Sequence, residues 1–177
     1  MKQFLLIGCL VGGVLFSACG FRPLPYGGGG GPAPTKVAIQ NFANDSFEPG
    51  IEFTFTDAIY REFLRRGDLR VVDDPAAADL VLTARIQPLR TRSRSFSSVK
   101  LALEYEVTVQ LDLEVRRVDG SAVSLDPGML QTSEFYLASA DVEVLRKNRQ
   151  EALRRMADIL AMRIHDALYI QVAAPAP

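Results

Sequence analysis

A stretch of strict alternation, residues 101–115, constrains the fold more than any other part of the chain. Its apolar positions are Leu101, Leu103, Tyr105, Val107, Val109, Leu111, Leu113 and Val115. Successive side chains of a β-strand point to opposite faces, so this period predicts one long strand. One face should be buried, whereas the face that carries Glu104, Glu106, Asp112 and Glu114 should meet water.

Shorter patterns on either side of this strand complete the expected fold. Strands are predicted over residues 36–42, 69–72 and 80–86, and over 122–137 after an Asp119-Gly120 turn, with an interruption near Pro127. Apolar residues at helical spacing predict a helix from about Pro49 to Arg66, ended by Gly67, and a second helix over residues 141–169. These elements predict a two-layer α+β fold: about four to five strands, with two amphipathic helices packed on one face of the sheet.

The first 18 residues have the pattern of an export signal peptide. Lys2 precedes an apolar run over residues 4–16, and the small residues Ser17 and Ala18 precede Cys19. This run is shorter than the roughly 20 residues that a membrane-spanning helix needs. Phe16-Ser17-Ala18-Cys19 resembles the lipobox of bacterial lipoproteins, in which the cysteine thiol takes the lipid. We expect a covalent lipid on Cys19 and no cofactor.

The rest of the chain divides into three further parts. Residues 19–35 are predicted to form the lipidated cysteine and a Gly- and Pro-rich tether. Residues 36–170 are predicted to form a single α+β domain, and residues 171–177 a frayed tail. Both cysteines lie at or before the proposed cleavage site, so the mature domain offers no thiol for a disulfide, a metal or a nucleophile. Without Lys2, 19 basic residues stand against 21 acidic ones, so no overall positive charge attracts nucleic acid.

Catalytic and metal-binding patterns are missing from the sequence, which therefore predicts no enzyme. The single histidine, His165, lies in the last predicted helix, where packing or plain exposure is the simpler explanation. The basic side chains form two clusters, Arg90, Arg92, Arg94 and Lys100 between two predicted strands, and Arg146, Lys147 and Arg149 in the last helix. Guanidinium groups hold phosphates in a bidentate fork, so either cluster suits an anionic lipid headgroup, and solubility explains each cluster equally well.

Together these features resemble the lipopolysaccharide-assembly lipoprotein family, LptE. The resemblance is carried by Cys19-Gly20-Phe21-Arg22 after the signal, by the order of strands and helices, by Leu103-Glu104-Tyr105 in the long strand, and by Asn148-Arg149-Gln150 in the final helix. It implies a lipid-anchored protein on the periplasmic side of the cell outer membrane. Such a protein plugs the β-barrel protein LptD, helps it to assemble, and aids lipopolysaccharide delivery to the outer leaflet.

The resemblance also implies lipopolysaccharide contacts at two places. One is a basic residue just before the Glu-Tyr strand, where Arg94 and Lys100 flank the expected position. The other precedes the Asn-x-Gln segment, where Arg146 matches. A different class of role remains open, because periplasmic lipoproteins that activate an envelope enzyme or form a secretion pore also begin with a strand, an amphipathic helix and a short strand.

Overall fold

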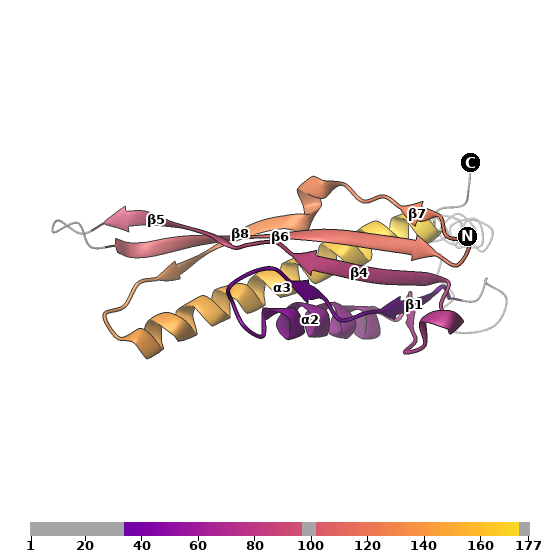
Figure 1. Ribbon diagram of the computed structural model, residues 1–177, viewed down its shortest axis with the longest axis horizontal. Helices are drawn as coiled ribbons and strands as arrows, with labels where there is room; N and C mark the ends of the chain where they lie inside the picture. Colours follow the sequence, from indigo (N-terminus) through magenta and orange to yellow (C-terminus); the bar gives the residue numbers. More distant parts are fainter. Residues whose placement is uncertain (1–33, 97–101, 174–177) are drawn as a thin grey trace, which may run out of the picture. The chain divides into compact units, whose positions relative to one another are not determined.

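The computed structural model describes residues 34–96 and 102–173, and the described chain forms a unit that begins at Pro34. The predicted signal peptide, Cys19, the tether up to residue 33, Lys100 and residues 174–177 lie outside the described residues. The elements follow in the order β1 (Lys36–Ile39), β2 (Ala43–Asn44), α2 (Ile51–Arg66), β3 (Arg70–Val71), the 3-10 turn η2 (Pro75–Ala77), β4 (Leu80–Ile86), β5 (Arg90–Phe96), β6 (Ala102–Arg117), β7 (Ala122–Val123), the 3-10 turn η3 (Pro127–Leu130), β8 (Gln131–Leu137) and α3 (Val142–Ala173) (Figure 1).

Strand β6 is the centre of the sheet, because it pairs with other strands along both of its edges. On one edge its second half pairs antiparallel with β4 and its first half with β5. On the opposite edge its second half pairs with β7 and its first half with β8. The predicted alternation is confirmed in the middle of the strand, where Val107, Val109, Leu111 and Val115 are buried, whereas Leu103 near its beginning is 51% exposed.

Within the described residues the sheet contains eight strands, more than the four to five expected. Three positions across the sheet are each occupied by two short strands in line, namely β1 with β2, β4 with β5, and β7 with β8. The turn η3 separates β7 from β8 where the sequence predicts an interruption, and the Asp126 side chain accepts a hydrogen bond from the Gly128 N–H at 2.8 Å. The α+β fold class is confirmed, with both parallel and antiparallel pairs in the sheet.

The prediction that Arg90, Arg92 and Arg94 lie in a connection between two strands is wrong, because these residues belong to β5. Arginine, threonine and serine alternate here, so no apolar period marks the strand. The extended backbone comes instead from pairing with β6, as where Arg92 lies opposite Glu106. The register shifts between Ser93 and Ser95, which makes Arg94 the extra residue of a bulge.

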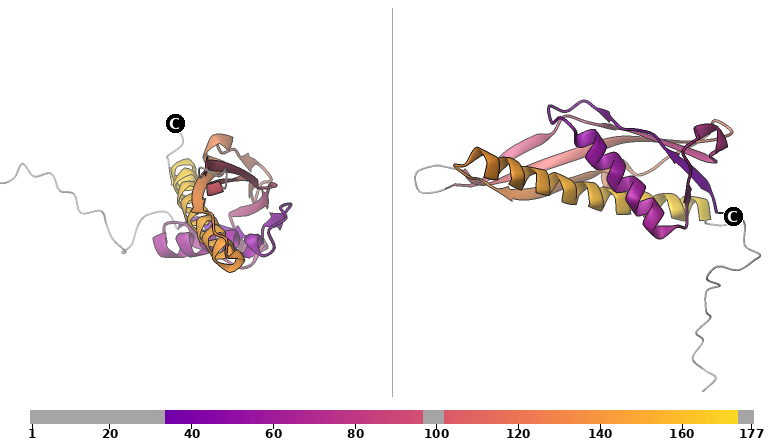
Figure 2. Two further views of the ribbon diagram at one scale, coloured as in Figure 1. Left: turned by 90° about the vertical axis from the view of Figure 1, so that its left-hand side faces the viewer. Right: turned by 90° about the horizontal axis from the view of Figure 1, so that it is seen from below.

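Helices α2 and α3 pack side by side on one face of the sheet, as predicted (Figure 2). Gly67, with φ of 74°, caps α2 in the left-handed conformation that glycine adopts without strain. Helix α3 continues to Ala173, beyond the expected end at Tyr169. The buried side chains on the two helices include Ile51, Phe55, Ile59 and Phe63 of α2, and Leu153, Met156, Leu160, Ile164 and Leu168 of α3.

His165 packs into the interface between the two helices. Its side chain is 1% exposed, and neither ring nitrogen has a hydrogen-bond partner. The Phe63 ring meets the imidazole edge-on, with the ring centres 5.0 Å apart. Burial lowers the pKa of His165, and the charge of Arg66 lowers this pKa further, against the opposing effect of Asp166. The folded protein therefore favours the neutral imidazole more than the unfolded chain does.

We expect acidification to weaken the fold through His165. The unfolded chain binds a proton near the ordinary histidine pKa of about 6.5, whereas the folded chain resists protonation until a lower pH. The free energy of unfolding should therefore fall as the pH drops below about 6.5, by up to about 1.4 kcal/mol per pH unit. Urea denaturation of the wild type and of His165→Leu at about pH 7 and about pH 5.5 measures this slope. An equal slope in the two proteins would contradict the prediction.

Candidate functional site

Two of the three predicted binding residues lie at the same end of the described unit. Strands β5 and β8 finish at this end, and β6 and α3 begin there (Figure 1). We call it the distal end, because β1, where the described chain starts, begins at the opposite end of the sheet. Arg94 and Arg146 lie here, whereas Lys100 falls outside the described residues.

Arg94 lies on the sheet face that the helices leave uncovered. Its guanidinium stands over the Phe135 ring, 5.6 Å from the ring centre, and its Nε lies 3.8 Å from a Glu106 carboxylate oxygen. Glu106 lies opposite Phe135 across the β6–β8 pair, so both belong to this face. Arg94 remains 55% exposed, which leaves its guanidinium accessible to a ligand on the surface.

Arg146 belongs to the beginning of α3, on the other side of the sheet. The Asp141 side chain caps this helix by accepting a hydrogen bond from the Glu143 N–H at 2.8 Å. Arg146 pairs with Glu143 at 2.6 Å, and this hydrogen bond raises the pKa of the arginine. The structure therefore brings Arg94 and Arg146 to the same end without joining them, because each pairs with a different carboxylate.

Arg149 donates hydrogen bonds to three side chains from other elements, and the sequence does not predict these contacts. Its Nε donates to Glu48 at 2.8 Å, and its Nη1 donates to the Tyr136 hydroxyl at 3.1 Å and to Thr91 Oγ1 at 3.3 Å. Tyr136 in turn stacks on Tyr105, with the ring centres 5.4 Å apart. One side chain thus joins α3 to β5, to β8 and to the loop before α2.

The charge of Arg149 is stabilised although the residue is partly buried. Burial acts to lower the pKa of Arg149, but the hydrogen bond that Arg149 donates to Tyr136 and the charge of Glu48 outweigh burial and raise this pKa. The sequence places Arg149 in a basic cluster and in the Asn148-Arg149-Gln150 segment, but it does not predict these contacts, because the partners lie in other strands and loops. The Nε and Nη1 donors of this guanidinium are thus used within the fold.

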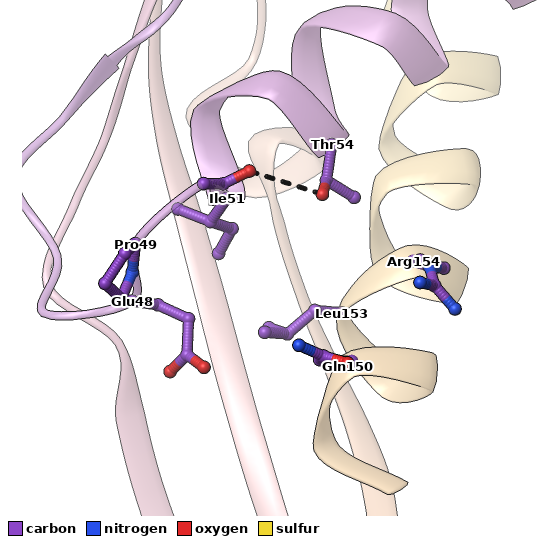
Figure 3. Close-up of a pocket in the computed structure, with 8 residues that line it drawn as sticks. Glu48, Pro49, Ile51, Thr54, Gln150, Leu153 and Arg154 are labelled. Carbon is purple, nitrogen blue, oxygen red and sulfur yellow. Dashed lines mark hydrogen bonds between the residues drawn. The ribbon is translucent and has the colours of Figure 1, made fainter. Parts of the chain in front are cut away.

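A hollow of about 160 Å³ lies between the beginning of α2 and the middle of α3 (Figure 3). Its lining residues are Glu48, Pro49, Gly50, Ile51, Thr54, Gln150, Leu153 and Arg154. The Thr54 hydroxyl donates to the Gly50 carbonyl at 3.4 Å, and Glu48 is held by Arg149. The hollow suits a few water molecules, each occupying about 30 Å³, better than a lipid chain.

Residues suited to catalysis or metal binding are not gathered in the described part of the chain. His165 is buried without a hydrogen-bond partner, so it cannot serve a substrate as a general base. Across residues 34–96 and 102–173, no group of three or more His, Cys, Asp and Glu side chains could hold a metal ion. Neither described α-helix is both long and apolar enough to cross a bilayer.

A protein-family model described as "LptE: Lipopolysaccharide-assembly" matches residues 35–168 of the chain. No curated protein matches the sequence.

Several solved structures share the fold at low sequence identity. Rare lipoprotein B from Shewanella oneidensis is 16% identical, with a TM-score of 0.55 over 78% of this chain and 96% of that one. A lipoprotein B from Nitrosomonas europaea is 13% identical, with a TM-score of 0.56 over 80% and 86% of the two chains. A hypothetical protein from Chlamydia trachomatis is 14% identical, with a TM-score of 0.53 over 81% and 100%. At these identities the likeness concerns the fold alone.

We expect Arg149→Ala to destabilise the protein more than Arg146→Ala does. The first change leaves Glu48 and the Tyr136 hydroxyl without their partner in a partly buried place, which costs about 1–3 kcal/mol. The second removes one exposed ion pair, which contributes about 0.5 kcal/mol or less. Urea denaturation of both variants measures the difference, and equal losses of stability would contradict the assignment.

Proposed function

Because this chain belongs to the LptE lipopolysaccharide-assembly family, we propose that it is an outer-membrane lipoprotein, anchored through lipid on Cys19, that plugs an LptD-type β-barrel. In this role it helps the barrel to assemble and assists delivery of lipopolysaccharide to the outer leaflet. The family match over residues 35–168 carries the proposal, since it spans nearly every described element. The protein acts as a binding and assembly factor, not as an enzyme.

The uncovered face of the sheet supports the barrel contact. We call it the outer sheet face. It presents polar side chains along the whole length of β6, namely Glu104, Glu106, Thr108, Gln110, Asp112 and Glu114. Thr108 shares a hydrogen bond of 2.7 Å with Ser133 of β8, and Arg85 of β4 pairs with Asp45 at 2.9 Å. The interior of an outer-membrane barrel is polar, so a surface of this kind can pair with lumen side chains.

The arginines of the distal end support contact with lipopolysaccharide. Arg94 and Arg146 are each more than half exposed, and among the described residues each pairs with one carboxylate. Guanidinium groups bind phosphate through paired, charge-assisted hydrogen bonds. Because the two arginines lie on opposite sides of the sheet, we propose that they meet separate phosphates or one ligand that wraps the distal end. Lys100, which is identified from the sequence alone, is the third residue of the proposed lipopolysaccharide site.

The first test is a pull-down of the tagged lipoprotein from detergent-solubilised outer membranes. We expect a large β-barrel protein to co-purify in an equal molar amount. Mass spectrometry of the purified chain should find acyl chains on Cys19. Recovery of a peptidoglycan synthase or a pore ring without the barrel would instead favour an activator or secretion role.

Arg146→Ala should weaken binding of purified lipopolysaccharide, whereas Arg154→Ala should not. Both arginines lie on α3, are similarly exposed, and pair with a glutamate three residues earlier, but Arg154 lies away from the distal end. Loss of one charge-assisted contact, about 1.4 kcal/mol, corresponds to about a tenfold increase in Kd. Titration with fluorescently labelled lipopolysaccharide measures both values. Equal affinities in the two variants would remove Arg146 from the proposed site.

A further inference from the structure

The loop between β2 and α2, residues 45–50, presents an aromatic side chain to solvent. Phe47 is 100% exposed, the highest value among the large apolar residues of the described chain. The apolar residues on either side of the loop behave differently, because Phe42 and Ile51 are both buried in the core. We call residues 45–50 the Phe47 loop.

Polar contacts of the residues around Phe47 hold this loop in place. The Asn44 side chain accepts hydrogen bonds from the Ser46 N–H at 2.9 Å and from the Ser46 hydroxyl at 2.6 Å, and it donates to the Glu48 carbonyl at 3.0 Å. The Ser46 hydroxyl oxygen accepts a further bond from the Glu48 N–H at 3.2 Å. Single exposed apolar side chains are common on protein surfaces. Phe47 differs from these because its backbone is fixed on both sides by contacts in which its ring takes no part.

The charges of the Phe47 loop favour a protein over a membrane as its partner. Asp45 pairs with Arg85 of β4 at 2.9 Å, and Glu48 pairs with Arg149 of α3 at 2.8 Å. The loop has no basic residue of its own, whereas anionic membrane surfaces attract clusters of Lys and Arg. A fully exposed ring between two neutralised carboxylates therefore suits an apolar recess in a protein.

The Phe47 loop lies at the margin of the described unit, where a surrounding wall would meet it. Asn44, directly before the loop, pairs with Ile86 at the end of β4. The right-hand view of Figure 2 shows the turn from β2 into α2 at the outside of the unit. A barrel around the unit would face this margin with its lumen wall, which is polar in outer-membrane barrels. An aromatic ring can be buried against such a wall only where the wall has an apolar recess.

We propose that Phe47 is an anchor that inserts into an apolar recess on the inner wall of the β-barrel protein that this chain plugs. A loop that is already fixed loses little conformational freedom on binding, so the apolar contact contributes efficiently to affinity. Interfaces draw most of their binding energy from a few side chains that fill pockets in the partner. One anchor at the margin would also fix the rotation of the unit within the barrel. This inference rests on the proposed function.

Phe47→Ser tests the anchor, with Val118→Ser as the matched control. Val118 is 80% exposed in the turn between β6 and β7. Each tagged, full-length lipoprotein is purified with its barrel from detergent-solubilised outer membranes, and dissociation of the complex is measured on dilution. We expect Phe47→Ser to raise the Kd about 30-fold, as loss of a central interface side chain does, and Val118→Ser to leave the Kd unchanged. The urea midpoint of both variants should equal that of the wild type, because no described residue covers Phe47.

The other outcomes overturn the inference in distinguishable ways. An unchanged Kd in Phe47→Ser, when the wild type does recover the barrel, means that the ring does not contact the barrel and leaves the proposed function intact. Equal losses of affinity in the two variants mean that the Phe47 loop has no special role. A lower urea midpoint in Phe47→Ser means that another part of this chain covers the ring. A wild-type preparation without the barrel overturns the proposed function, and this inference with it.

Discussion

The pairing of β6 on both edges is the constraint on which the rest of the unit depends. Its backbone donors and acceptors meet β4 and β5 on one side and β7 and β8 on the other, so its register places every neighbouring strand. Its apolar positions face the helices and its polar positions form the outer sheet face. A shift of one residue would exchange these two faces, so the apolar alternation and the hydrogen-bond register must agree.

The sequence predicts the elements whose apolar period matches their geometry. Strand β6, strand β4 and both helices follow from the spacing of Val, Leu, Ile and Phe, and Gly67 ends α2 as expected. Strand β5 could not be predicted in this way, because its alternating side chains are arginine, threonine and serine. Its extended form arises from pairing with β6, an interaction between segments that no local pattern contains.

The roles of the basic residues in the candidate site also depend on contacts that no local sequence pattern contains. Arg146 and Arg149 are one turn apart on α3, and the residue pattern, apart from the family resemblance, gives no reason to treat them differently. What lies opposite them decides their roles: Arg149 meets Glu48 and Tyr136 and joins elements of the fold, whereas Arg146 pairs with Glu143 of its own helix and stays exposed. Arg94 gains its position from a bulge in β5, which depends on the register with β6.

The position of α3 after all eight described strands has a consequence for the order in which the fold can close. Leu153, Met156, Leu160, Ile164 and Leu168 of this helix cover a large part of the inner face of the sheet. A chain that is synthesised or translocated from its N-terminus therefore completes every strand before the helix that covers them is present. Until the last 32-residue helix arrives, the apolar side of β4 and β6 is open to water and to other chains. Newly made molecules would need protection by chaperones during this interval, and chains that end before Leu153 would aggregate.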